Sequence, residues 1–185
     1  KGEVANDSSG KKRNGELKNF DSDTDQWVKG QVGNALRFDG KNDEILLNSN
    51  DFKNISWSGM SVSSWANHEL ENNDHKAAHV LRIDTKDEGS IWLRFSGKKT
   101  FPHIQFYDKW FSINNKIIPQ REWFHFGFMY DGKGVNLFYN GKVLPAKKFT
   151  QEKRASFISS ASVIKLGGSP HLAHERWKGA IDDLR

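Results

Sequence analysis

The chain of 185 residues has no cysteine, two methionines and four prolines. The lack of cysteine excludes disulfide bonds, thiolate metal sites and cysteine nucleophiles. No apolar run approaches the roughly 18 residues of a membrane-spanning helix, so we expect no membrane span. The length fits one domain, residues 1–185. Because the chain begins at Lys1 rather than methionine, we expect this domain to be cut from a larger secreted protein whose signal peptide lies outside the sequence.

Strong clustering of charge is also missing. Basic residues outnumber acidic ones by 28 to 23, a net charge of +5. Nucleic-acid-binding proteins usually gather such charge on one face, whereas here it is spread along the chain, so we expect no nucleic-acid partner. The positive excess would suit an anionic ligand such as an acidic polysaccharide, or it only keeps the protein soluble. We interpret the following basic groups as solvated surface charge: Lys11-Lys12-Arg13, Lys98-Lys99, Lys147-Lys148 and Lys153-Arg154.

Aromatic residues are abundant, with seven Trp, thirteen Phe and three Tyr, and 16 glycines accompany them. This composition favours β structure. Residues 1–34 are polar and rich in turn signals. We interpret them as a surface loop, and the alternative is a loop whose carbonyls and carboxylates surround a hard cation. Beyond them, short β-like runs recur without helical crossovers, which indicates an antiparallel sandwich or barrel. The runs are Ala35–Phe38, Glu44–Leu47, Met60–Ala66, His79–Ile83, Ile91–Phe95, Phe101–Tyr107, Trp110–Ile113, Trp123–Tyr130, Val135–Tyr139, Val163–Leu166 and a last one from Gly179.

Turn signals set the register of these strands. Asp131-Gly132 and Asn140-Gly141 are strong hairpin signals. Asp108-Lys109 would close a two-residue hairpin between Tyr107 and Trp110. Since side chains alternate across a strand, this pairing, with the run Ile91–Phe95 as the next strand, predicts one outer face made of Trp92, Arg94, His103, Gln105, Tyr107 and Trp110.

The chemistry of that predicted face suits a sugar ligand. Aromatic rings offer flat apolar surfaces to the C–H side of a pyranose, and Arg, His and Gln offer donors to hydroxyls and carboxylates. Arg94 would pair with the carboxylate or sulfate of an acidic sugar. The alternative is an ordinary polar outer face, on which Trp92 and Trp110 cover the sheet edges or pack under a loop.

The stretch from Trp123 to Val143, WFHFGFMYDGKGVNLFYNGKV, carries the most specific pattern of the chain. Trp123, His125 and the two hairpin signals resemble the central hairpin of LamG-like, concanavalin A-like jelly-roll domains. Three further pieces resemble motifs of the same family, in the same order along the chain. They are Asp7-Ser8-Ser9-Gly10, the stretch GNALRFDG at residues 33–40, and the closing GAIDDLR at residues 179–185.

The resemblance implies an all-β fold, an antiparallel β-sandwich of jelly-roll type. It also implies a carbohydrate-binding or adhesive module of a secreted protein, which in bacteria is often attached to a polysaccharide-degrading enzyme. A structural Ca²⁺ is common in similar folds, and Ca²⁺ takes six to eight oxygen ligands. Carried over to this chain, the candidate ligands are Asp7, Asp39 or the carbonyl of Gly40, and Asp182. Without a metal, Asp7 would cap a turn and Asp182 would pair with a lysine.

Enzymatic alternatives find little support in the sequence. Jelly-roll glucanases carry an E-x-D-x-E strand, which is missing here. Jelly-roll alginate lyases are partly echoed by His103-Ile104-Gln105 with Arg94 and Tyr107 nearby, where the tyrosine could act as base and acid, but two further lyase motifs are missing. We expect a non-catalytic carbohydrate-binding module. An adhesion or protein-interaction module and a polysaccharide lyase are the alternatives.

Histidine clusters form the last candidate sites. His171 and His174 are spaced to share one helical turn, and a polar stretch contains His68, His75 and His79. Neither set matches a strong metal motif. We therefore interpret these residues as solvated loop histidines.

Overall fold

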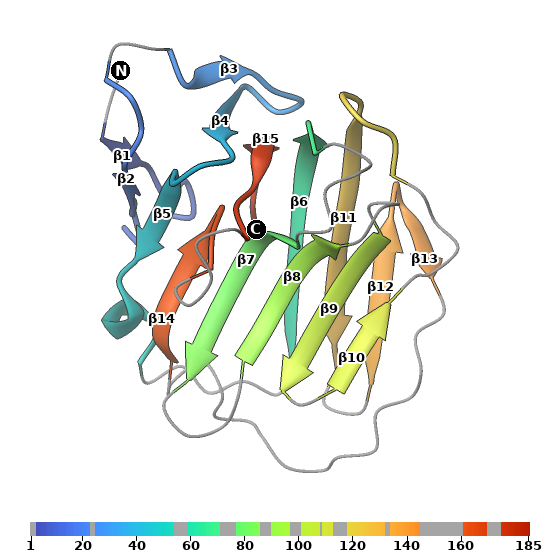
Figure 1. Ribbon diagram of the computed structural model, residues 1–185. Coiled ribbons are helices and arrows are strands. Elements are labelled where there is room, and N and C mark those ends of the chain that lie inside the picture. The colour runs from blue at the N-terminus through green and yellow to red at the C-terminus, as the bar shows by residue number, and fades with distance from the viewer. Residues whose placement is uncertain are drawn as a thin grey trace.

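Two antiparallel β-sheets make up the computed structural model, which describes residues 3–22, 25–53, 59–70, 77–85, 90–96, 101–107, 109–112, 118–131, 134–144, 161–169 and 175–185. Figure 1 shows strands β7 to β10 in front of β6, β11 and β12. One sheet, called the front sheet, has eight strands in the order β1-β2-β5-β14-β7-β8-β9-β10, and the rear sheet has seven in the order β13-β12-β11-β6-β15-β4-β3. The jelly-roll sandwich expected from the sequence is confirmed.

The strands of the two sheets come from all parts of the chain. Those of the front sheet are β1 (Val4–Ala5), β2 (Gly15–Lys18), β5 (Glu44–Leu47), β14 (Ala161–Leu166), β7 (Ala78–Thr85), β8 (Ser90–Ser96), β9 (Phe101–Tyr107) and β10 (Lys109–Ser112). Those of the rear sheet are β13 (Lys142–Leu144), β12 (Val135–Tyr139), β11 (Trp123–Tyr130), β6 (Met60–His68), β15 (Lys178–Asp182), β4 (Asn34–Asp39) and β3 (Trp27–Lys29). One 3-10 turn, η1 (Ser49–Phe52), follows β5, and no helix in the described ranges is long and apolar enough to cross a membrane.

The interpretation of residues 1–34 as a loop was wrong for three short strands. β2 pairs with β5, β1 pairs with β2, and β3 pairs with β4. These strands are only two to four residues long. They are too short to show an alternating pattern, and pairing with their partner strands stabilises them.

The hairpin between β9 and β10 also differs from its prediction. Trp110 lies opposite Gln105 and Lys109 opposite Phe106, so the pairing is shifted by two residues from the predicted match of Tyr107 with Trp110. A shift of two keeps every side chain on its predicted face, because the side-chain period of a strand is two. The Asn140-Gly141 turn is confirmed. Tyr139 pairs with Lys142, and both turn residues have the positive φ that a tight hairpin requires.

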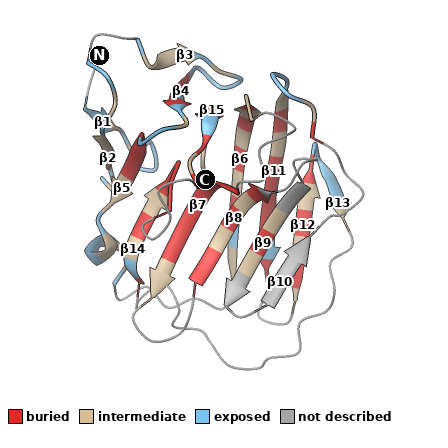
Figure 2. Ribbon diagram, in the orientation of Figure 1, coloured by how far each residue is buried: buried red, intermediate tan, exposed pale blue. Residues whose placement is uncertain are grey.

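The core lies between the sheets and is rich in phenylalanine. On β11, Phe124, Phe126 and Phe128 are buried, while Met129 on the opposite side is 38% exposed. The ring of Phe95, from β8 in the facing sheet, packs at 5.4 Å from Phe124 and 5.0 Å from Phe126. This pattern appears in Figure 2 as alternating buried bands on β6, β11 and β12. The predicted inward face of β11 is therefore confirmed.

Strand β7 departs from this alternation, because six consecutive residues from Ala78 to Ile83 are all buried. Leu81 and Ile83 pair with the core residues Leu93 and Ile91 of β8. His79 and Arg82 belong to the other side, the outer face of the front sheet, and they are buried as well. Buried polar side chains need partners, so this outer face is the place to look for a site.

Candidate functional site

A cross-strand row of residues crosses the outer face of the front sheet. Trp92 of β8 lies between Arg82 of β7 and Gln105 of β9, and Gln105 is followed by Trp110 of β10. In the neighbouring row, Arg94 lies opposite both His79 and His103, and Ser112 follows His103. All six residues that the sequence placed on one face therefore belong to three adjacent strands. The side chains of Tyr107 and Trp110 are outside the described part of the structure.

Trp92 is half-buried and is flanked by two guanidinium groups. The Cζ atom of Arg82 lies 4.2 Å from the centre of the Trp92 ring, and that of Arg94 lies 5.2 Å from it. The ring of His79 meets Trp92 edge-on at 5.3 Å. Cation–π and edge contacts of this kind favour one orientation of the indole ring. Trp92 is thus held in place from several sides.

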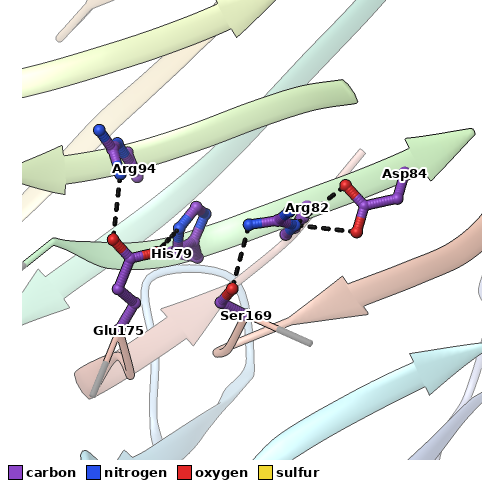
Figure 3. A network of polar contacts seen from close by, with 6 residues as sticks. All are labelled: His79, Arg82, Asp84, Arg94, Ser169 and Glu175. Atoms are coloured by element: carbon purple, nitrogen blue, oxygen red, sulfur yellow. Dashed lines mark hydrogen bonds and ion pairs between the residues drawn. The ribbon is translucent and has the colours of Figure 1, made fainter. Parts of the chain in front are cut away.

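Glu175 ties this arrangement to a distant part of the chain (Figure 3). Its Oε1 accepts a hydrogen bond from Nη1 of Arg94 at 3.2 Å, and its Oε2 lies 2.7 Å from Nε2 of His79. His79 is fully buried and Glu175 nearly so. One carboxylate therefore joins the segment before β15 to both β7 and β8.

The second guanidinium has its own carboxylate. Nε of Arg82 donates to both oxygens of Asp84, at 3.0 and 2.9 Å, and Nη1 donates to the Ser169 hydroxyl at 3.0 Å. Ser169 follows β14 in the chain, so Arg82 also connects two elements (Figure 3). Both arginines next to Trp92 are neutralised by neighbouring carboxylates.

The histidines of this face are uncharged near neutral pH. Burial lowers the pKa of His79, although the hydrogen bond with Glu175 acts in the opposite direction. Burial alone would raise the pKa of Glu175, but the hydrogen bond with His79 and the charge of Arg94 bring it below its usual value. An ionised carboxylate only accepts, so Nε2 of the neutral His79 carries the proton and donates it to Glu175. Burial, with the charge of Arg94, also lowers the pKa of His103 to about 4.

Sequence reasoning missed most of this network. His79, although it begins one of the predicted β-like runs, was interpreted as a solvated loop histidine, and so was His68; both lie in strands and are fully buried. His75, His171 and His174 are outside the described residues. Arg82 and Asp84, two positions apart on one strand, carried a signal that was available, since i and i+2 share a face. Glu175 carried none, because it is 96 residues from His79.

Of the four residues predicted to bind calcium, Asp39 and Asp182 lie apart on the rear sheet. Asp39 lies beside Lys178 at one end of the β4–β15 ladder, and Asp182 lies four residues further along, about 13 Å away. Asp182 Oδ2 accepts from the backbone N–H groups of Gln31 and Val32, both at 2.7 Å. Within the described ranges, no three His, Cys, Asp or Glu side chains are placed to hold a metal ion. Asp39 and Asp182 are too far apart to share one ion, and calcium binding stays a prediction.

Asp7 and Asp39 also have hydrogen-bond partners within the protein. Asp7 accepts hydrogen bonds from the backbone N–H groups of Ser9 and Arg13 and from the Ser9 hydroxyl, so it organises its own turn, as the sequence alternative proposed. Asp39 accepts from the N–H of Lys41 in the turn that contains Gly40, which has a φ of +80°. These bonds explain the acidic residues of both turns without a metal.

Asp43, next to this turn, gives a test by pH. Burial, together with repulsion from Asp39 and Asp21, raises the pKa of Asp43 to about 6. The hydrogen bond that the Asp43 carboxylate accepts from the backbone N–H of Asp39 acts in the opposite direction. A carboxyl whose pKa is higher in the folded state stabilises the fold at low pH. The protein loses this contribution to its free energy of unfolding as the pH rises from about 4 through 6. We expect Asp43→Asn to stabilise the fold at pH 8 by about 1–3 kcal/mol, because the amide oxygen still accepts from Asp39.

Urea unfolding of Asp43→Asn and the parent at pH 8 and pH 4 measures this effect. The two proteins should have nearly the same stability at pH 4, where the carboxyl of the parent is protonated in the folded state. A variant that is less stable than the parent at pH 8 would contradict the raised pKa.

With this geometry in place, comparison with known proteins gives the family. A model of the concanavalin A-like lectin/glucanases superfamily matches residues 39–185. The chain belongs to this superfamily. A search of curated protein sequences finds no match.

Solved structures similar to this concanavalin A-like chain share its fold at low sequence identity. Domain 4 of the extracellular GH43 arabinanase AbnA from Geobacillus stearothermophilus, in complex with arabinotriose, is 20% identical with a TM-score of 0.61, and the match covers 86% of this chain and 72% of that one. The CBM40 of the Ruminococcus gnavus IT-sialidase, bound to α2,3-sialyllactose, is 12% identical with a TM-score of 0.54, covering 70% and 76%. The binding domain of botulinum neurotoxin serotype D is 18% identical with a TM-score of 0.63, covering 96% and 43%.

Proposed function

We propose that this chain is a non-catalytic carbohydrate-binding module of a larger secreted protein, and that it binds a polysaccharide on the outer face of β7 to β10. The observation that carries the proposal is the row Trp92–Gln105–Trp110 across three adjacent strands. A half-buried indole ring offers an apolar contact to a sugar ring, and the Gln105 side chain beside it is neutral.

The environment of Trp92 supports this role. A ring that is already fixed by Arg82, Arg94 and His79 loses little conformational freedom when a ligand binds, and this pre-organisation increases affinity. His103, neutral and next to Gln105 on the same side of β9, adds a second uncharged group able to donate to or accept from a hydroxyl.

The solved structures of similar fold support the same class of function. The arabinanase domain was solved with arabinotriose and the sialidase module with sialyllactose, so both are sugar-binding members of this architecture. Each of them belongs to an enzyme that acts on carbohydrate. At such low identity they support the kind of ligand and not its identity.

The arrangement around Arg94 disfavours the polysaccharide lyase. A lyase of this type needs an arginine that neutralises the carboxylate of a uronate. In this chain the guanidinium of Arg94 donates to Glu175, so a second carboxylate would meet that negative charge. Arg94 was also the basis for the predicted acidic ligand, and the same pairing argues against that prediction.

Trp92→Ala is expected to weaken polysaccharide binding by about 1–3 kcal/mol, because it removes the ring that the surrounding residues hold in place. The matched control is Trp65→Ala on β6, which removes the same side chain from the outer side of the rear sheet, where Trp65 packs at 5.2 Å from His125. Affinity electrophoresis through gels with arabinan, xylan, β-glucan, polygalacturonate or alginate measures retention.

The parent protein should be retarded by at least one of these gels, and Trp65→Ala should be retarded equally. Trp92→Ala should be retarded much less than the parent, measured at a temperature where the variant is folded. The proposed site would be wrong if Trp65→Ala loses retention and Trp92→Ala keeps it.

A further inference from the structure

We infer that the glycan recognised at this face is uncharged, and that Arg82 and Arg94 support Trp92 rather than bind an acidic group of the ligand. The inference rests on the proposed function and specifies its ligand class. It reverses what the net charge of +5 and the presence of an arginine on this face suggest from the sequence.

The first step is the charge balance around Trp92. Arg94 is paired with Glu175 at 3.2 Å, and Arg82 with Asp84 at 2.9 Å. Two cations next to the aromatic ring are therefore matched by two carboxylates, all of them largely buried (Figure 3). Pairs that are buried together and matched in number leave little net field for an approaching anion.

Two cations further along the sheet share a single carboxylate. Lys165 of β14 lies opposite Arg82 in the cross-strand row, and its Nζ donates to Oε1 of Glu44 at 2.8 Å. Nη1 of Arg176 donates to the other oxygen of Glu44 at 2.7 Å. Both cations therefore have a carboxylate partner within the protein, although the two share one negative charge.

The second step is what an acidic ligand would displace. A ligand carboxylate that approached the Arg94 guanidinium would come next to the Glu175 carboxylate, and like charges at such a distance repel each other. Moving Glu175 away would remove the hydrogen-bond acceptor of Nε2 of His79, a fully buried ring. Leaving a buried donor without its acceptor is costly. Glu175 therefore protects Arg94 from anions.

The third step is what remains to contact the ligand. Trp92 offers part of an indole ring, Gln105 a neutral amide, and His103 a neutral imidazole, all on adjacent strands. Amide and imidazole groups match hydroxyls, which both donate and accept. Hydroxyls of a neutral polysaccharide fit these groups without the loss of any ion pair.

Gel retention at two salt concentrations tests the inference on the unmodified protein. The neutral probes are arabinan, xylan and β-glucan, and the anionic probes are polygalacturonate, alginate and heparin. We expect retention by at least one neutral polymer, unchanged between about 50 mM and about 500 mM sodium chloride, because binding without charge pairs is not screened by salt. Retention by anionic polymers alone, lost at the higher salt, would overturn the inference and leave the proposed function standing. If the folded protein is retained by no polymer, the proposed function fails and the inference with it.

A charge-removing variant adds a second, independent measurement. Glu175→Gln keeps an acceptor for His79 but removes the negative charge facing Arg94, and we expect its affinity for polygalacturonate at low salt to rise by roughly tenfold. The matched control is Glu3→Gln, which makes the same change of net charge at an exposed residue just before β1, at the opposite edge of the sheet. An equal rise in both variants would show that net charge, not release of Arg94, determines anion binding, and would overturn the role given to Glu175. If Glu175→Gln does not fold, the salt experiment on the parent protein still decides the ligand class.

Discussion

Phe126→Ala is expected to lower the free energy of unfolding by about 3–5 kcal/mol, the usual cost of removing a phenylalanine from a packed core. Phe126 is 2% exposed, and its ring lies 5.0 Å from Phe95 of the facing sheet and 5.4 Å from Phe124 of its own strand. The substitution opens a cavity where the two sheets meet. The cavity cannot close easily, because β11 is paired on both sides, with β12 and with β6.

Urea unfolding followed by tryptophan fluorescence measures the loss, and Met129→Ala on the same strand is the matched control. Met129 points outward and is 38% exposed, so its truncation should change the free energy of unfolding by less than about 1 kcal/mol. A typical domain has a free energy of unfolding of about 5–15 kcal/mol. Phe126→Ala should therefore still show an unfolding transition, at a lower urea concentration than the parent. If Met129→Ala is the more damaging change, the assignment of faces on β11 is wrong.

The strands that build the core were predictable because their signal is local. Alternating large apolar residues, as in Phe124, Phe126 and Phe128, mark a strand with one buried face wherever its partners are. The predicted faces were also correct because side chains alternate with a period of two, so a register error of two residues does not change them. The β9–β10 register was predicted two residues away from its true position, yet Trp110 and Gln105 still fell on the same side.

What could not be predicted depends on contacts between distant segments. The polar strand Gly15–Lys18 exists because β5 pairs with it, and nothing in its own four residues indicates a strand. The buried pair of His79 and Glu175 joins residues 96 positions apart. A histidine in a polar stretch is indistinguishable from a solvated one until its partner is known, and the same holds for Arg94, whose charge suggested an anionic ligand until Glu175 was placed beside it.

Trp177→Ala should lower the free energy of unfolding by a similar amount, about 3–5 kcal/mol, and also weaken glycan binding. Trp177 is fully buried; its ring lies 5.5 Å from Phe95 and 6.4 Å from His68, and its backbone N–H donates to the carbonyl of Gly167. Two residues earlier, Glu175 holds His79 and Arg94 on the outer face. The indole ring therefore anchors in the core the segment that fixes the network around Trp92.

The comparison with Phe126→Ala separates this coupling from a general loss of stability. Both variants remove a core aromatic ring, but only Trp177 belongs to the segment that supplies Glu175. Retention is measured on the neutral polymer that binds the parent, at a temperature where both variants are folded. It should fall at least severalfold for Trp177→Ala and stay unchanged for Phe126→Ala. Trp177→Phe, which keeps a large apolar ring at this position, should restore most of the binding. Equal retention of the two alanine variants would mean that the network around Trp92 keeps its geometry without the core anchor, and that Glu175 is positioned by its own ion pairs alone.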